Sequence, residues 1–240
     1  MKLYQFPISH YCEKARWAIQ YKRLPYKRKT LLPGLHRKPM LRLSGQSSLP
    51  VLKDEKAIVS GSSEIVSYLD ATYPRFQLTP EDATLAARSL KWEAMADEKV
   101  GPSVRKIIYS VLLDHPNIVI PLFIYEGPFY SNFVLKRSFP KIQEALRRGL
   151  PITDESVSET VAELKAVISE MRNNMDSEHY IVGDKFSRAD LAFASLLAPL
   201  FRPGKYGGES PSYYPEKLEN IIAEFDEVKP WVMEIYSRHR

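Results

Sequence analysis

The alternation of hydrophobic and polar positions predicts two strands and one helix at the start of the chain. A short strand is expected at 2–6, where Pro7 ends it. Small and apolar residues then recur at helical spacing in 11–21, which predicts a helix with one apolar face. A second strand is expected at 25–31. Two strands joined by a helix form a βαβ unit, which favours a parallel pair.

The next stretch has a different pattern. Residues 33–47 are polar and interrupted by Pro and Gly, with room for one irregular helix. Strands are expected at 49–52 and 57–59, joined by a turn at 54–56, and a helix with an inward apolar face at 62–72. The order βαβ followed by ββα, in under 80 residues, is that of a thioredoxin-like fold.

The remaining sequence predicts helices. The clearest lies at 154–176, where apolar residues repeat at spacings of three and four. Ser187 and Asp190 form a capping-box pattern, which predicts a helix start before the apolar stretch 191–200. This stretch is apolar on nearly all sides, as a buried central helix would be. A last helical stretch is expected at 217–236, interrupted at Pro230.

These patterns predict two structural domains of different class. We expect an α/β thioredoxin-like N-terminal domain at 1–76, a linker at 77–83 and an all-α helical C-terminal domain at 84–240.

Composition narrows the class of protein. The 240 residues are 44% hydrophobic and 26% charged, which excludes a disordered chain, a collagen and a coiled-coil rod. No apolar run approaches the ~20 residues of a membrane-spanning helix. The first residues carry no apolar signal core before a small-residue cleavage site. We therefore expect a cytoplasmic protein with no membrane partner.

The net charge of +5 is unevenly placed. Residues 1–76 hold 14 Lys or Arg against 5 Asp or Glu, whereas 77–240 hold 20 against 24. A basic N-terminal part could attract a small anion or a nucleic acid, or could simply be a solvated surface. No nucleic-acid motif is present, and the basic run 27–29 is too short for a binding patch. We expect no nucleic-acid partner.

Cysteine and histidine usage limits the chemistry further. Cys12 is the only cysteine of the sequence, so an internal disulfide is impossible, which suits a reducing compartment. The five histidines are scattered, and no Cys or His has the spacing of metal ligands. We expect no bound metal.

The turn Ser9-His10-Tyr11-Cys12 is the stretch most suggestive of chemistry, because it leads from the first strand into the first helix. Helix N-termini favour a thiolate or another anion. Redox proteins of the thioredoxin-like fold place Cys-x-x-Cys here, with the first Cys as the nucleophile. Ser9 takes that first position; it can donate a hydrogen bond to the thiolate of a bound ligand, or can simply cap the helix.

Cys12 takes the second, recessed position of that motif. The interpretation we favour is a buried small hydrophobic residue. His10 and Tyr11 could face a ligand; alternatively, the first faces solvent and the second packs between the domains.

The sequence resembles the cytosolic glutathione transferases over nearly its whole length. The stretches that carry the resemblance, in order, are Leu3-Tyr4-Gln5-Phe6, the turn from Ser9 to Arg16, Ser48-Leu49-Pro50-Val51-Leu52, Gly61-Ser62-Ser63 and Phe186-Ser187-Arg188-Ala189-Asp190-Leu191. Each motif alone is weakly specific, and the ordered set is strongly specific.

The resemblance implies a role for Ser9 at the catalytic Ser or Cys position of the Theta, Zeta and Omega classes. Ser9 would hold the glutathione sulfur as a thiolate nucleophile. Val51 would pair its backbone with the cysteinyl part of glutathione, and Ser62 would bind the γ-glutamyl carboxylate. The remaining residues expected at the glutathione site are His10, Tyr11, Cys12, His36 with Arg37 or Lys38, Leu49, Pro50 and Ser63.

Gly61 departs from the family pattern, which usually has Glu or Asp before the serine at this place. That acid helps to hold the γ-glutamyl ammonium group, so its absence would cost roughly ten- to hundredfold in glutathione affinity. Glu64 is three positions further on and is expected to face another way.

The resemblance also implies a site for a hydrophobic electrophile between the domains, and a homodimer. Its candidate residues, at helical spacing, are Trp92, Met95, Arg105, Tyr109 and Phe123. An apolar cleft with Arg105 nearby would suit an aromatic electrophile.

Three functions remain open on the sequence alone. The first is an enzyme of detoxification that conjugates glutathione to an electrophile. The second is a glutathione-dependent thiol reductase using Cys12, which the recessed position of Cys12 disfavours. The third is a binding or scaffold protein without activity, as in elongation factor gamma subunits or metaxins, which Gly61 keeps open.

Overall fold

A computed structural model describes residues 1–55, 57–207 and 213–240. The N-terminal part is a four-stranded sheet in the order β2-β1-β3-β4. Its strands are β1 (Lys2–Gln5), β2 (Lys27–Thr30), β3 (Val51–Lys53) and β4 (Ile58–Ser60). β1 pairs with β2 in parallel, and β3 pairs with β1 and β4 in antiparallel fashion. The βαβ unit and the hairpin predicted from the sequence are both present.

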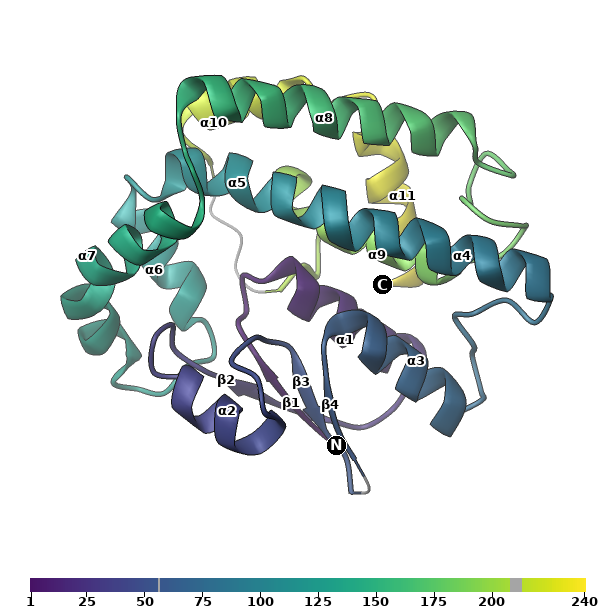
Figure 1. Cartoon of the computed structure of the whole chain (residues 1–240), viewed down its shortest axis with the longest axis horizontal. Coiled ribbons are helices and arrows are strands. Elements are labelled where there is room, and N and C mark those ends of the chain that lie inside the picture. The colour runs from purple at the N-terminus through teal and green to yellow at the C-terminus, as the bar shows by residue number, and fades with distance from the viewer. Residues whose placement is uncertain (56, 208–212) are drawn as a thin grey trace.

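Three helices accompany the sheet: α1 (His10–Tyr21), α2 (Arg37–Ser44) and α3 (Ser62–Thr72). α1 and α3 lie side by side between the sheet and the helical part of the chain (Figure 1). α1 is buried along nearly its whole length, including the fully covered Trp17. The thioredoxin-like part therefore uses one sheet face to support the helical part.

The rest of the chain is helical. Its elements are α4 (Ala83–Met95), the π-helix η1 (Ala96–Val100), α5 (Gly101–Leu112), α6 (Pro116–Ile124), α7 (Ser131–Gly149), α8 (Asp154–Asn173), α9 (Arg188–Phe201), α10 (Glu216–Ala223) and α11 (Lys229–His239). All fourteen residues of α9 are buried, and α9 packs against α1, α4, α5 and α11. The predicted fold class and the buried central helix are confirmed.

Several predicted boundaries shift. The second strand covers only Lys27–Thr30, and the long helix ends at Asn173. The last helical stretch divides into α10 and α11, with Pro230 in the first turn of α11, as its missing N–H allows. The π-helix between α4 and α5 has no counterpart in the sequence prediction. The proposed domain boundaries at 76 and 83 remain a prediction.

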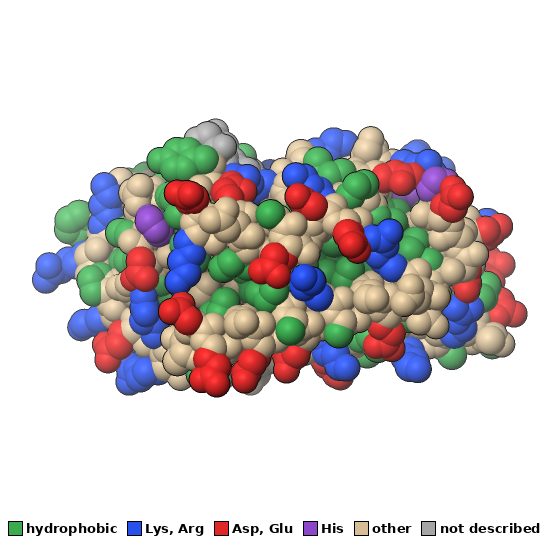
Figure 2. Space-filling model, turned by 90° about the horizontal axis from the view of Figure 1, so that it is seen from above, with side chains coloured by type: hydrophobic (Ala, Val, Ile, Leu, Met, Phe, Trp, Pro, Cys, Tyr) green, Lys and Arg blue, Asp and Glu red, His purple; other side chains and the backbone are tan. Residues whose placement is uncertain are grey.

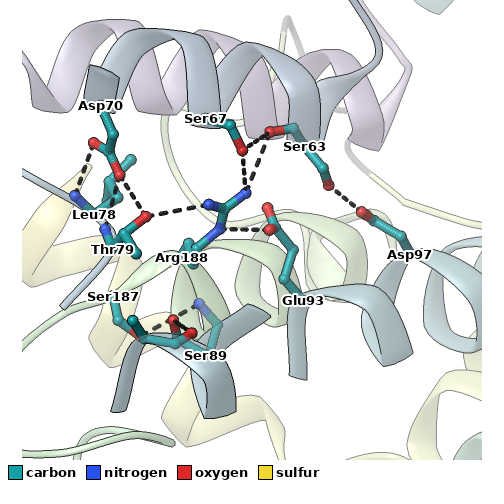
Figure 3. A network of polar contacts seen from close by, with 12 residues as sticks. Ser63, Ser67, Asp70, Leu78, Thr79, Ser89, Glu93, Asp97, Ser187 and Arg188 are labelled. Carbon is teal, nitrogen blue, oxygen red and sulfur yellow. Dashed lines mark hydrogen bonds and ion pairs between the residues drawn. The ribbon is translucent and has the colours of Figure 1, made fainter. Parts of the chain in front are cut away.

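Buried charges join the two parts of the chain (Figure 3). Lys14 of α1 bonds Glu93 at 2.9 Å and Asp97 at 2.8 Å. Arg188, the first residue of α9, bonds Glu93 at 2.5 Å and also reaches Ser67 of α3. Each of these cations therefore has carboxylate partners, as buried charges require.

The surface is otherwise of mixed charge. On the face seen in Figure 2, acidic and basic side chains alternate over the helical part, and neither sign forms a broad patch there. Among the described residues, no helix has the length and apolar character needed to span a bilayer.

Candidate functional site

Ser9 begins α1 as its N-cap, directly after β1 and a short turn. Its φ and ψ of −73° and 121° are extended, and its Oγ accepts a hydrogen bond from the Cys12 N–H at 3.3 Å. The Ser9 side chain also hydrogen-bonds the Cys12 side chain, so a ligand thiolate would compete with that thiol for the hydroxyl proton of Ser9. Ser9 also lines a cavity, so the capping and ligand-facing roles expected from the sequence are compatible.

This cavity has a volume of about 690 Å³ and lies between the sheet part and the helical part. Its wall on the sheet side is formed by Phe6, Ile8, Ser9, His10, Tyr11, the segment 33–37, Ser48 and Leu49. Its other wall is formed by Val104, Arg105, Ile108, Tyr109, Phe123, Val134, Ser138, Lys141, Ile142, Ala145, Leu146 and Pro199. The size and the mostly apolar lining are those of a small-molecule site.

The cavity brings together only part of the predicted site. Nine of the predicted residues line it: Ser9, His10, Tyr11, His36, Arg37, Leu49, Arg105, Tyr109 and Phe123. Eight others lie outside its lining: Cys12, Lys38, Pro50, Val51, Ser62, Ser63, Trp92 and Met95.

Cys12 is fully buried beneath the turn. Burial raises the pKa of its thiol, so Cys12 carries a proton at neutral pH. A buried protonated thiol is a poor nucleophile, which agrees with the interpretation of Cys12 as a packing residue.

Tyr11 crosses to the helical part instead of standing free in the cavity. Its hydroxyl donates to the Asp97 carbonyl in the π-helix at 2.7 Å. The phenol lies against Gly101, where any side chain would overlap its hydroxyl group. Tyr11 therefore forms one cavity wall and fixes it to the start of α5.

His10 is 6% exposed and bonds the Gly101 backbone. Burial, and next the charge of Arg105, lowers the pKa of His10 to about 3, so the ring is neutral at physiological pH. Its Nε2 has no hydrogen-bond partner within the described residues.

Of the three basic residues predicted near α2, two line the cavity and one lies outside it. His36 and Arg37 line the cavity, and the His36 ring packs edge-on against Phe6 at 4.8 Å between centroids. Burial lowers the pKa of His36, so Arg37 is the permanent cation here. Lys38 is exposed and lies outside the lining.

Val51 is placed differently from the expectation. It lies in β3 opposite both Tyr4 of β1 and Ser60 of β4, so it has no free sheet edge for an added strand. Leu49 precedes the cis peptide to Pro50 and lines the cavity. In the described part of the chain, Leu49 makes no backbone–backbone hydrogen bond. Backbone pairing with a ligand is therefore available at Leu49 and not at Val51.

The start of α3 corrects another expectation. Ser62 is its first residue and is 6% exposed. Gly61 has a φ of +97°, and the Glu64 carboxylate folds back over it, into the space where a Gly61 side chain would begin. The expectation that Glu64 faces another way is wrong, because the absent Gly61 side chain leaves room for that carboxylate.

Ser63 and Trp92 have structural partners. The Ser63 hydroxyl donates to Asp97 and accepts from Lys14 at 2.7 Å, within the network that joins the two parts. Trp92 is 8% exposed and packs edge-on against Phe193 in the helical core.

The sequence prediction missed α7 as a wall of the cavity. Its lining residues Val134, Ser138, Lys141, Ile142 and Ala145 recur at spacings of three and four along one helix face. That periodicity was the available signal. Within residues 1–55, 57–207 and 213–240, no cluster of three His, Cys, Asp or Glu side chains could hold a metal ion.

Comparison with known families identifies the family to which the chain belongs. The family model for the N-terminal domain of glutathione S-transferase matches residues 3–80. The model for the C-terminal domain of the same family matches residues 139–239. The chain belongs to the glutathione S-transferase superfamily. The resemblance stated from the sequence is confirmed at this level, and the Ser/Cys-type class remains a prediction.

Three members of the superfamily match this chain at low sequence identity. Glutathione S-transferase TCHQD of Arabidopsis thaliana is 24% identical over 212 residues, 83% of this chain and 77% of that protein. A glutathione S-transferase structure from Rhodospirillum rubrum has a TM-score of 0.67 at 19% identity, covering 99% of this chain and 88% of that one. A family member from Pseudomonas fluorescens, solved with two glutathione bound, has a TM-score of 0.66 at 16% identity, with the same coverage of 99% and 88%. At these identities, the two structures establish the shared fold.

Proposed function

We propose that this superfamily member is a glutathione transferase that conjugates reduced glutathione to a hydrophobic electrophile, with Ser9 as the catalytic residue. One observation carries the proposal: the Ser9 hydroxyl stands at the N-terminus of α1 and lines a cavity shared by both parts of the chain. Glutathione would occupy the wall from the sheet part, and the electrophile the apolar wall from the helical part.

Ser9 and the helix act on the glutathione sulfur together. The Ser9 oxygen accepts from the Cys12 N–H, and its hydroxyl would donate its proton to the bound sulfur and stabilise a thiolate. The positive end of the α1 dipole favours the same charge. The thiolate then attacks the electrophile: a carbon–sulfur bond forms, the leaving group departs with its electron pair, and the thiol proton passes to solvent.

The remaining parts of glutathione would find partners along the same side. The Leu49 backbone would pair with the cysteinyl residue as an added strand does. Arg37 and His36 would face the glycyl carboxylate. Ser62, at the start of α3, would bind the γ-glutamyl carboxylate, and Glu64 would bind the neighbouring ammonium group.

The thiol reductase is less well supported, because burial and a raised thiol pKa remove Cys12 from the reaction. An inactive binding module would lack catalysis, because its Ser9 hydroxyl would not act on the sulfur. A homodimer in the cytoplasm, expected from the superfamily, remains a prediction.

Ser9→Ala tests the catalytic assignment. We expect kcat/KM with 1-chloro-2,4-dinitrobenzene to fall roughly ten- to hundredfold, because one preorganised donor to the thiolate is lost. The pH–rate profile should also move to higher pH as the bound thiol becomes less acidic. Calorimetry should still detect glutathione binding by the variant.

Two further variants separate catalysis from folding. Ser9→Gly lacks the hydroxyl but retains most of the helix-cap stability, so its activity should fall as in Ser9→Ala. Ser103→Ala, on α5 outside the cavity lining, should retain the parent activity. Full conjugation activity in folded Ser9→Gly would reject the role of Ser9, and wild-type protein that binds no glutathione at millimolar concentration would reject the function.

A further inference from the structure

The cavity has cations on its walls, and within the described residues no carboxylate lines it. Arg37 is the first residue of α2, Arg105 lies on α5, and Lys141 lies on α7. In the described part of the chain, none of these three side chains forms an ion pair or a hydrogen bond. A mostly apolar cavity with uncompensated positive charge attracts anions.

The other cations of helix α7 differ among themselves. Arg147 bonds Asp114 at 2.6 Å and Arg148 lies 3.6 Å from Glu144, whereas the exposed Lys136 and Arg137 have no acidic partner within the described residues. Lys141, on the cavity-facing side of the same helix, has none within the described residues. Lys141 is therefore one of several α7 cations without an acidic partner, and its place in the cavity lining distinguishes it from the others.

The groups around Arg105 do not neutralise it either. Those with electrostatic influence from Arg105 are His10, Tyr11 and Tyr109. Burial lowers the pKa of His10 to about 3 and raises the pKa of each tyrosine to about 12. All three are therefore neutral at physiological pH, and the guanidinium remains the local charge.

The cations lie on two different walls. Arg37 lies beside His36 on the wall assigned to glutathione. Arg105 and Lys141 belong to the helical wall, among apolar residues that include Ile108, Phe123 and Ile142. The second pair would consequently face the electrophile.

Building on the proposed function, we propose that the preferred acceptor is an amphipathic organic acid. Its apolar body packs on the helical wall, and its carboxylate, sulfonate or phenolate binds Arg105 and Lys141. Neutral electrophiles of the same shape fill the apolar surface but leave both cations without a partner.

A binding experiment tests this independently of catalysis. The probes are 8-anilinonaphthalene-1-sulfonate and its uncharged counterpart N-phenyl-1-naphthylamine, followed by fluorescence with and without S-methylglutathione. We expect Arg105→Gln and Lys141→Gln each to weaken binding of the sulfonate roughly three- to tenfold, the range for a partly solvated charge contact. Binding of the neutral probe should stay within about twofold, because its apolar contacts are retained.

Lys136→Gln is the matched control, because Lys136 is an exposed residue of α7 outside the cavity lining. It should bind both probes as the parent does. Equal weakening of both probes by Arg105→Gln and Lys141→Gln, or no weakening of the sulfonate by either, would overturn the proposal.

Paired acceptors then test the proposal in the reaction. The compounds are 4-chloro-3-nitrobenzoate and 4-chloro-3-nitrobenzamide; glutathione thiolate attacks the ring carbon that carries chlorine, the carbon–sulfur bond forms, and chloride leaves. The acid-to-amide ratio of kcat/KM should fall roughly three- to tenfold in Arg105→Gln and stay unchanged in Lys136→Gln. An unchanged ratio in Arg105→Gln contradicts the proposal. If the parent conjugates neither compound and no other electrophile, the proposed function fails, while the fluorescence experiment still decides the anion site.

Discussion

Gly61 enters α3 with a φ of +97°, a conformation that side chains other than glycine rarely adopt. The Glu64 carboxylate covers the same point, so an acidic residue at 61 would meet both backbone strain and another carboxylate. Glu64 forms no ion pair or hydrogen bond within the described residues. An acid is therefore present at the start of α3, supplied from three positions further along the helix.

Replacing Glu64 with Gln tests whether this carboxylate meets the glutathione ammonium. We expect glutathione affinity to fall roughly three- to tenfold, because a charge-assisted contact at an exposed site is lost. Titration calorimetry measures the change. A glutathione analogue that lacks the α-amino group should bind the parent and the variant alike.

Glu55→Gln is the control for the loss of one acidic charge, since Glu55 lies in the exposed turn between β3 and β4. It should bind glutathione as the parent does. If Glu64→Gln also binds as the parent does, the ammonium group has another partner.

At the scale of elements, two helices begin with a capping box in different surroundings. In α9, Asp190 accepts from the Ser187 N–H at 2.8 Å and from the Ile181 N–H at 2.7 Å, and all these groups are buried. In α8, Ser156 accepts from the Thr153 N–H at 3.0 Å on the exposed surface. Water can replace the second contact but cannot reach the first.

Replacing the side chain at the third helical position of each box with alanine should therefore lower the free energy of unfolding by different amounts. Asp190→Ala leaves two buried N–H groups without acceptors, and we expect about 2–4 kcal/mol lower free energy of unfolding. Ser156→Ala should cost about 1 kcal/mol or less. Urea denaturation measures both, and kcat/KM of the folded variants should match the parent. A similar cost for both variants would show that burial does not govern the box in α9.

Elements were predictable where the side-chain period is regular over a long segment. The apolar repeat of α8 and the capping box and apolar run of α9 fixed both helices within a few residues. The π-helix Ala96–Val100 has no signal in the side-chain period; within it, the Asp97 carbonyl accepts from Tyr11, a residue far away in the sequence.

Within the site, the sequence indicated Ser9 through its place at a strand–helix junction, and the structure places Ser9 in the cavity. It did not indicate that Val51 is paired on both sides, because that register is a property of the sheet. Ser62 and Ser63 are neighbours on α3, and their side chains differ only in the direction in which they point. The sequence pattern does not define that direction. Its bonds to Lys14 and Asp97 depend on residues distant in sequence.

At the scale of the whole molecule, carboxylates hold together segments that are far apart in the chain. Glu13 of α1 bonds Arg240, which lies directly after α11, at 2.8 Å, and also bonds Arg16. Asp70 of α3 bonds Lys22 at 2.8 Å and accepts from the Thr79 N–H in the segment leading to α4. Both carboxylates thus connect the sheet part to later segments of the chain.

The pKa values of Glu13 and Asp70 determine how these contacts between distant segments respond to acid. Burial alone would raise the pKa of Glu13, but Arg16 and Arg240 outweigh it and hold the pKa below 4.5. Burial likewise opposes the hydrogen bonds from Lys22, Thr79 and Leu78, which hold the pKa of Asp70 below 3.8. A lower pKa in the folded state means that the unfolded chain binds protons first. Stability is therefore complete above about pH 4.5 and is lost as the pH falls through the lower folded values.

Asp70→Asn should consequently change the free energy of unfolding at neutral pH and also the slope with which it falls in acid. At pH 7, we expect about 2–4 kcal/mol lower free energy of unfolding, because the buried Lys22 loses its carboxylate. Below about pH 3.8, the variant should lose stability less steeply than the parent, since one of the linked protonations is gone. Urea denaturation from about pH 3 to 7 measures both effects.

Asp226→Asn removes an exposed acid 3.9 Å from Lys229 and should leave the profile within about 0.5 kcal/mol of the parent. An unchanged slope of stability against pH in Asp70→Asn would mean that protonation elsewhere, such as at Glu13, controls the loss of stability in acid.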